Sequence, residues 1–369
     1  MEAVQEKIAV PELRFKGFTE SWNEFRMEKI FSHFRSGQGI TSSQISESGA
    51  YPVYGGNGLR GFTSTFTHDG FFFLIGRQGA LCGNINRAYG KAFISEHAVA
   101  CQSNASSDTE FLAQRLDYYN LNRLSESSAQ PGLSVAKLLR FKLHIPTLPE
   151  QEKIAGFLSA VDKKIAALQQ KKEALTQYKK GVMQKLFAQE IRFKQANGNP
   201  YPNWEEKKLG EVCIKNSSTL SANTIEENTG DYKLYGASGF IKGVDFYNEE
   251  SPYVSIVKDG AGVGRVLMCE GFSSVLGTLD IIRERIGNNL YFIYCLLEQV
   301  RMKKYITGST IPHIYFKDYS KEKLQIPCLE EQEKIAGYLS ALDKKIAATQ
   351  AQLTHTQQFK KGLLQKMFV

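Results

Sequence analysis

The sequence predicts a mixed α/β (α+β) fold in which two globular domains are joined by two long antiparallel coiled-coil helices. Three observations predict it: a 40-residue stretch occurs twice, both copies carry a heptad pattern, and the segments before them are similar. Residues 148–187 and 329–368 are identical at 25 of 40 aligned positions, with an offset of 181 residues. The chain is therefore an internal repeat with pseudo-two-fold symmetry. We expect a first domain at 1–147, its helix at 148–188, a second domain at 189–328 and its helix at 329–369.

Each copy of the repeated stretch is predicted to be one long helix. Its apolar positions step by four and three residues in alternation, which is the period of a coiled coil. Pro149 and the acidic residues after it suit a first helical turn, and 39 residues span about 58 Å. The positions that form this seam include Ile154, Leu158, Val161, Ile165, Leu168, Leu175, Val182, Ile335, Leu339, Leu342, Ile346, Leu353 and Leu363.

A narrow apolar seam on a long polar helix needs a partner, and the other copy is the nearest candidate. Chain connectivity then makes the pair antiparallel, with one globular unit held at each end of a rod. The alternative is that each helix packs only on its own domain. The seam is too narrow and too long for one small domain, which favours the paired arrangement.

Composition limits the class of protein. A chain of 369 residues with 42 % hydrophobic content can form two domains with real cores, and its net charge of +8 favours an acidic partner. The six cysteines have neither CxxC nor zinc spacing, so we expect buried thiols and no metal site. There is no signal-peptide pattern and no run of 18 apolar residues, so we expect a cytoplasmic protein without a membrane span.

The two domains are similar in outline but differ in sequence. Tyrosines and glycines of 51–62 align with those of 232–243, as strands that run into tight turns. Arg77 aligns with Lys258, so each domain places a cation at the end of an apolar strand. We expect helices at 108–124 and 287–304, then a polar turn and a last strand before each long helix. One geometry is therefore kept while two surfaces vary.

Catalytic motifs are missing. We find no Walker A loop, no HExxH, no GxSxG and no motif of amino-methyltransferases. The Gly260-Ala-Gly262-Val-Gly264 run lacks the GxGxxG spacing of a dinucleotide loop, and the first domain lacks its middle glycine. The sequence therefore favours a non-catalytic binding protein.

Two different domains on a rod suit the recognition of a bipartite DNA site, whose halves lie roughly 34 Å apart for one helical turn. The loops carry donors that suit phosphates or guanine edges: Arg60, Arg77, Gln78, Arg87, Lys242, Lys258 and Arg265. Further candidates for phosphate or base contacts are Gln130, Ser134, Thr310 and His313. Each of these residues, taken alone, also fits a surface or structural role.

Four sequence runs are characteristic of a known family: YPVYGGNGLRGF, IGRQGALCG, QPGLS…IPTLPEQEKIAGFLSAVDKKI and its second copy IPCLEEQEKIAGYLSALDKKI. Through these runs the chain resembles, over nearly its whole length, the DNA-specificity subunits of type I restriction–modification systems. The resemblance implies two target-recognition domains, each reading one half of an asymmetric, gapped sequence in double-stranded DNA. It also implies that the helices set the gap and dock two methyltransferase subunits, to which two restriction subunits can join. S-adenosylmethionine, Mg²⁺ and ATP would belong to those partners, with no cofactor in this chain.

The sequence departs from the repeat at one place, and two other classes of protein are alternatives to a specificity subunit. The second domain reads STIPHI where the first reads AQPGLS, which weakens the transfer of DNA contacts to Thr310 and His313. A non-catalytic scaffold that joins two protein partners would show no salt-dependent affinity for DNA, whereas a specificity subunit would show a steep one. A stand-alone α/β enzyme would turn over substrate without partners.

Overall fold

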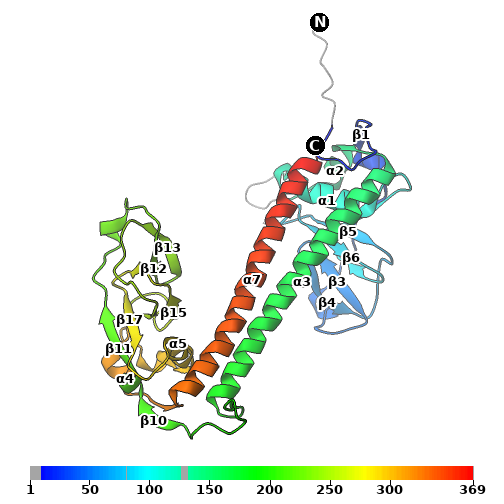
Figure 1. Ribbon diagram of the computed structural model, residues 1–369. Helices are drawn as coiled ribbons and strands as arrows, with labels where there is room; N and C mark the ends of the chain where they lie inside the picture. The colour runs from blue at the N-terminus through cyan, green and yellow to red at the C-terminus, as the bar shows by residue number, and fades with distance from the viewer. Residues whose placement is uncertain (1–9, 80, 126–131, 369) are drawn as a thin grey trace. The chain divides into compact units, whose positions relative to one another are not determined.

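The protein consists of two compact units in the computed structural model, which describes residues 10–79, 81–125 and 132–368. The first unit comprises Met1–Leu168 with Gln352–Val369, and the second comprises Gln169–Ala351. Each unit contains one globular domain and part of both long helices, α3 (Leu148–Phe187) and α7 (Leu329–Met367) (Figure 1).

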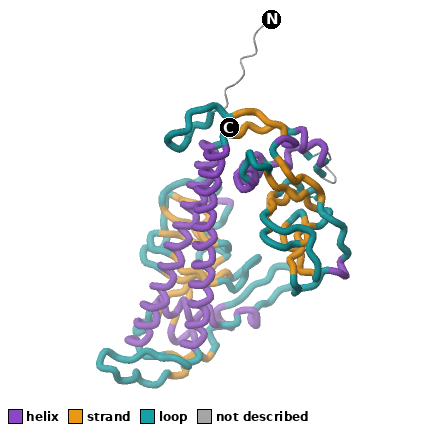
Figure 2. Tube along the Cα trace, turned by 90° about the vertical axis from the view of Figure 1, so that its right-hand side faces the viewer, coloured by secondary structure: helices purple, strands orange, loops and turns teal. Residues whose placement is uncertain are grey.

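The long helices pack against each other within both units (Figure 2). In the first unit, Asp162 of α3 forms an ion pair of 2.6 Å with Lys360 of α7. In the second unit, Lys179 of α3 forms an ion pair of 2.7 Å with Asp343 of α7. The aspartates are 181 positions apart, and so are the lysines, so the repeat relates these two contacts. The predicted antiparallel pair of helices is confirmed.

The predicted seam positions lie on the packed face of each helix. Ile165, Leu175, Val182 and Ile346 are half-buried, and the other nine are buried. Two threonines also lie in the seam of α7, at 349 and 356. Thr349 and Thr356 are buried, and their hydroxyls donate to the carbonyls four residues earlier, at 2.8 and 2.7 Å, which satisfies these polar groups inside the seam.

The described residues of the first globular domain form three small sheets. A four-stranded antiparallel sheet has the order β2 (Phe31–Ser36), β8 (Ala98–Ser103), β5 (Phe72–Gly76), β6 (Ile85–Ala88). A three-stranded sheet has the order β4 (Gly58–Thr63), β3 (Tyr51–Gly55), β7 (Phe93–Ile94), and β3 and β7 are parallel. β1 (Asn23–Arg26) pairs with β9 (Lys142–Ile145). The helices of this domain are α1 (Thr109–Tyr119) and α2 (Val135–Arg140), with short 3₁₀ turns at Met27–Lys29, Ser42–Gln44 and Leu121–Leu124.

The second domain repeats this topology. Its four-stranded sheet has the order β11 (Cys213–Ser217), β17 (Leu279–Glu284), β14 (Tyr253–Val257), β15 (Val266–Cys269). Its three-stranded sheet has the order β13 (Gly239–Val244), β12 (Tyr232–Gly236), β16 (Ser273–Val275), and β10 (Glu205–Lys208) pairs with β18 (Lys323–Ile326). The helices are α4 (Leu209–Val212), α5 (Leu290–Gln299) and α6 (Phe316–Tyr319), with 3₁₀ turns at Asn223–Ile225 and Met302–Tyr305. The predicted mixed fold and internal repeat are therefore confirmed.

Two details of the domains differ from the prediction. The helix expected at 108–124 is interrupted at Asn120, whose left-handed φ of 59° ends α1 before a 3₁₀ turn begins. The polar turn after it does not lead directly into the last strand, because the short helix α2 lies between them, as α6 does in the second domain. These six- and four-residue helices are too short to produce a clear period in the sequence.

The core of the first unit joins the domain to both long helices. Phe73 of β5 and Phe111 of α1 belong to one buried cluster with Leu158 of α3 and Leu363 of α7. The second unit has the matching cluster, which includes Phe292 of α5 and Leu339 of α7. Each helix therefore packs on a domain as well as on the other helix.

Candidate nucleic-acid interface

A buried ion pair fixes each domain to the first turn of a long helix. Glu150 of α3 is 1 % exposed and accepts from Arg14 Nε at 2.9 Å and Nη2 at 2.6 Å. Glu331 of α7 is fully buried and accepts from Arg192 Nε at 3.1 Å and Nη2 at 2.6 Å, and from Trp204 Nε1 at 3.0 Å. Bidentate pairing of this kind fixes the orientation of both groups. The repeated Glu-Gln dipeptide of the helices therefore has a structural role.

The glutamine of that dipeptide connects the long helix to the helix of the domain. Gln151 Oε1 accepts from the backbone N–H of Asp108 at 2.9 Å, and its Nε2 donates to the carbonyl of Pro146 at 2.8 Å. Gln332 makes the same two contacts, with the N–H of Asn289 at 3.0 Å and the carbonyl of Pro327 at 3.0 Å. The anchoring role of these residues was not predicted. The parallel occurrence of Arg14-Phe15-Lys16 and Arg192-Phe193-Lys194 was the signal that could have identified it.

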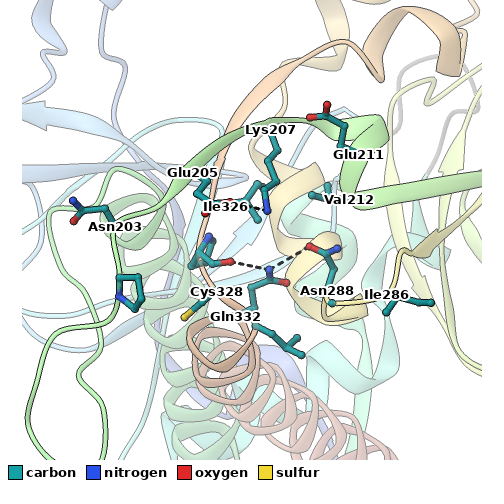
Figure 3. Close-up of a pocket in the computed structure, with 14 residues that line it drawn as sticks. Asn203, Glu205, Lys207, Glu211, Val212, Ile286, Asn288, Ile326, Cys328 and Gln332 are labelled. Atoms are coloured by element: carbon teal, nitrogen blue, oxygen red, sulfur yellow. Dashed lines mark hydrogen bonds and ion pairs between the residues drawn. The ribbon is translucent and has the colours of Figure 1, made fainter.

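A cavity of about 380 Å³ lies at this junction in the second unit (Figure 3). Its polar groups bind one another: Gln332 Nε2 donates to Asn288 Oδ1 at 3.2 Å, and Lys207 lies 2.9 Å from Glu205. The cavity therefore belongs to the joint between domain and helix. Within the described ranges, no group of three or more His, Cys, Asp or Glu side chains is placed to hold a metal ion.

Two of the predicted DNA-contact residues of the first domain, Arg77 and Gln78, lie where several strands of the sheets end. Asn86 Nδ2 donates to the carbonyl of Gly56 in the β3–β4 turn at 3.1 Å, and the N–H of Arg77 donates to the carbonyl of His97 at 3.0 Å. Gln78 lies in the same region, with Oε1 3.3 Å from Nδ1 of His97. Loops that are distant in the sequence thus form one polar surface.

Two more of the predicted residues lie beside this surface. Arg60 is exposed on β4, next to Gly55 of the β3–β4 hairpin. Ser134 is the N-cap residue of α2 and follows Leu133, whose N–H donates to the carbonyl of Arg77 at 2.9 Å. Gln130 lies outside the described residues.

Arg77 is the best-positioned cation of this surface. Its guanidinium is half-buried, and Nη1 donates to Ser36 Oγ at 2.8 Å. Nε is buried without a hydrogen-bond partner, and no carboxylate of the described residues lies within ion-pair distance of the guanidinium. The side chain is thus held in place while its charge is not neutralised by a neighbour.

Lys258 occupies the same position in the second domain, but its surroundings differ. The N–H of Ile314 donates to its carbonyl at 2.9 Å, as that of Leu133 does for Arg77. Its Nζ lies 3.3 Å from Oδ1 of Asp280, a carboxylate that is 3 % exposed. Arg77 and Lys258, which the alignment paired, therefore have equivalent places in the two backbones. The charged groups around their side chains differ.

The segment after the 3₁₀ turn at Met302–Tyr305 forms a tight loop beside Lys258. The backbones of Thr307 and His313 are joined by two hydrogen bonds of 2.9 and 2.8 Å, and the N–H of Gly260 donates to the carbonyl of Pro312 at 2.9 Å. Thr310 is exposed in this loop, and His313 is half-buried with Nδ1 3.1 Å from the carbonyl of Ile311. Both residues remain candidates for DNA contact.

Three of the predicted contacts are engaged within the protein. Arg87 binds Glu110 of α1 with a bidentate fork, at 3.0, 2.8 and 2.7 Å. Burial alone would lower the pKa of Arg87, but bonding to Glu110 raises it above its usual value. Lys242 donates to the carbonyls of Ile225 and Glu226, both at 2.9 Å. Arg265 Nη1 donates to the carbonyl of Ala237. The structure gives these three side chains a role in holding loops and strands together.

Comparison with known proteins places these features in a family. The family model of the type I restriction modification DNA specificity domain matches residues 19–177 and 201–356, once for each half of the repeat. The specificity subunit of the type I restriction enzyme EcoprrI of Escherichia coli is 42 % identical over 132 residues, which are 35 % of this chain and 33 % of that protein. The chain matches three curated specificity subunits over 33 %, 46 % and 60 % of their lengths, so it spans less than two thirds of each.

Solved structures match over a longer part of the chain. The S subunit of a type I restriction-modification system from M. genitalium has a TM-score of 0.77 at 20 % identity, over 97 % of this chain and 99 % of that one. A chain from a structure on complex assembly and conformational transition of the type I R-M system has a TM-score of 0.51 at 15 % identity, over 96 % and 99 %. These likenesses concern the fold. Because the family model covers most of the sequence in two matching copies, the chain belongs to the type I restriction modification DNA specificity family.

Proposed function

We propose that this protein is the DNA-specificity subunit of a type I restriction–modification enzyme and that each domain reads one half of an asymmetric, gapped target. The observation that carries the proposal is the repeated backbone with different loop chemistry. The carbonyls of Arg77 and Lys258 accept equivalent backbone bonds of 2.9 Å, while their side chains have different neighbours. Two domains that share a backbone but differ in their surface side chains suit a DNA target whose two halves differ in sequence.

The long helices set the gap between the two half-sites in this proposal and dock two methyltransferase subunits, to which restriction subunits can join. Apolar grooves along the helix pair of the first unit support a docking role. One of about 420 Å³ is lined by Phe157 and Phe359, and another of about 540 Å³ by Ile165 and Leu364. Partner helices commonly bind grooves of this kind. S-adenosylmethionine, Mg²⁺ and ATP would be bound by those partner subunits.

No helix among the described residues is both long enough and apolar enough to cross a membrane.

A genome-wide map of methylated adenine, in cells with and without this gene, tests the function. Loss of methylation at one split, asymmetric motif with a constant gap is the expected result, and it also supplies the target sequence. Unchanged methylation at every motif would contradict the proposal and favour a scaffold that joins two protein partners.

The role of the helices has its own test. Deleting seven residues from each long helix keeps the heptad register and is expected to shorten the gap of the methylated motif, since each residue contributes about 1.5 Å to a helix. A motif with an unchanged gap would show that the helices do not set it.

A further inference from the structure

The geometry points to a phosphate-binding clamp in the second domain, formed by Lys258 and Lys215 and positioned by the buried carboxylate of Asp280. It deepens the proposed function, because the ligand would be a backbone phosphate of the DNA that the second domain reads. Asp280 Oδ1 lies 3.3 Å from Nζ of Lys258 and 3.9 Å from Nζ of Lys215. Ser217 Oγ donates to the same oxygen at 3.0 Å.

The strand register shows why Asp280 can organise both lysines. Asp280 lies on the middle strand β17, where it pairs with Ser217 of β11 on one side and with Ile256 of β14 on the other. Lys215 is two residues before Ser217 on the same face of β11, and Lys258 follows the end of β14. One buried acceptor in the centre of the sheet thus reaches cations from both neighbouring strands.

The charges leave the cluster positive. Two ammonium groups face one carboxylate, so the net charge is +1, and no ion pair within the described ranges joins Asp259 to either lysine. The side chains of Lys258 and Lys215 are 23 % and 32 % exposed, so both lysines lie at the surface of the domain. Each ammonium carries three donors, of which Asp280 and Ser217 can use only some. A phosphate oxygen suits such a pair of point charges.

The first domain has no such cluster at the same place. Val99 pairs with Ser36 and Ile75 in the register in which Asp280 pairs with Ser217 and Ile256. Arg77, the counterpart of Lys258, is held by Ser36 Oγ at 2.8 Å. Asp280 is therefore not required by the fold of the sheet. Its burial in the second domain is explained if it holds two lysines for a ligand.

Lys258→Ala tests the clamp in the full chain, purified together with its methyltransferase partner. The probes are two duplexes, one with the motif found by the methylation map and one without it. Removing one phosphate contact is expected to reduce the slope of log affinity against log salt concentration by about 0.9 on both duplexes. The matched control is Lys233→Ala, which removes an exposed lysine that bonds Glu270 at 2.6 Å and is expected to leave the slope unchanged. An unchanged slope for Lys258→Ala would overturn the clamp.

Asp280→Asn tests whether the carboxylate positions the lysines. The substitution raises the net charge of the cluster from +1 to +2, so a site governed by charge alone would bind both duplexes more tightly. If Asp280 positions the lysines, binding weakens in spite of the added charge. Asp280→Val, which copies the residue of the first domain, gives a second variant in case the amide disturbs folding, and a thermal melt checks both.

The outcomes separate this inference from the proposed function. A wild-type complex that binds the split motif, with Lys258→Ala at the wild-type slope and Asp280→Asn binding more tightly, would overturn the clamp alone. A wild-type complex that binds neither duplex would overturn the proposed function, and the clamp with it.

Discussion

The two units are alike in their frame, by which we mean the sheets and the ion pairs that join each domain to the long helices. They differ in the side chains at the ends of their strands. In both, a buried glutamate at the start of a long helix binds an arginine, and an aspartate and a lysine join the two helices. At the sheet, however, Arg77 with Ser36 in the first unit corresponds to a cluster of Lys258, Lys215 and Asp280 in the second. The contacts that hold the architecture are repeated, and the contacts that would meet a ligand are not. Substitutions at equivalent positions can therefore separate frame from recognition surface.

The largest expected effect is on the frame. Glu331→Ala removes the carboxylate that Arg192 binds and leaves the buried indole N–H of Trp204 without its acceptor, so we expect a loss of about 2–4 kcal/mol in the free energy of unfolding. Glu150→Ala should cost about 1 kcal/mol less, because Trp22 Nε1 has no hydrogen-bond partner to lose.

Chemical unfolding of both variants measures this difference. Glu331→Gln is the intermediate variant: it keeps the shape of the side chain but only one of the two acceptor oxygens, so its loss should lie between those of wild type and Glu331→Ala. Equal losses for the two alanine variants would mean that the indole bond does not contribute and that the two frames are equivalent in energy as well as in geometry.

The next effect concerns the recognition surface. Arg77→Ala is expected to weaken DNA binding by about 1–3 kcal/mol and to relax the sequence preference in one half-site only, if Arg77 reads a base. Arg77→Lys keeps the charge but loses the planar fork, so it should relax the preference with a smaller loss of affinity. Selection of bound duplexes from a randomised pool measures the sequence preference of both variants, and a titration with one duplex measures their affinity. A preference relaxed in both half-sites would contradict independent reading by the two domains.

Much of the frame was predictable from the sequence, because the repeat and the heptad are regular patterns of apolar residues. Ile154 and Ile335 could be assigned to the seam from spacing alone, and both are buried. The anchoring role of Glu150 was not predicted. An acidic residue in a first helical turn is already explained by the helix dipole, so nothing in the local sequence indicates an arginine 136 positions earlier.

The proposed DNA contacts were predictable only as a set of candidate residues. The alignment of Arg77 with Lys258 located equivalent positions, and the backbone bonds of both are the same. It did not show which cations are free, since that depends on partners from other strands. Arg87 meets Glu110 from the following helix, and Lys258 meets Asp280 from the neighbouring strand. Such pairings depend on tertiary structure, which residue types and spacing do not specify.

A smaller effect is expected where the helices meet. Lys179→Met should cost about 1 kcal/mol in the free energy of unfolding, and Lys360→Met about 0.5 kcal/mol, because both pairs are partly exposed. The second unit should lose more, since the side chain of Lys179 is 12 % exposed and that of Lys360 is 24 % exposed, so solvent screens the pair of the second unit less. Thermal unfolding of the two variants checks the order. The reverse order would indicate that Tyr291, which also donates to Asp343, compensates for the lost lysine.

The smallest expected effect is a pH dependence confined to the first unit. Nε2 of His33 lies 3.4 Å from Nε2 of His68, and the pKa of each is lowered, mainly by burial, with Arg35 acting on His33 and His33 acting on His68. Because the folded pKa values lie below the ordinary 6.5, the neutral pair stabilises the fold above about pH 6.5. This stability is lost as the pH falls through the lowered pKa values.

The second unit carries Ile214 and Glu249 at the positions equivalent to the two histidines, and Glu249 bonds Arg283 there. Regional hydrogen exchange at pH 7 and pH 5.5 should therefore show weaker protection at low pH in β2 of the first unit and unchanged protection in β11 of the second. His33→Leu should reduce the difference between the two pH values, because it removes one of the two imidazoles that titrate there, while burial still lowers the pKa of His68. Equal loss of protection in both units would assign the acid sensitivity to the carboxylates of the repeated frame.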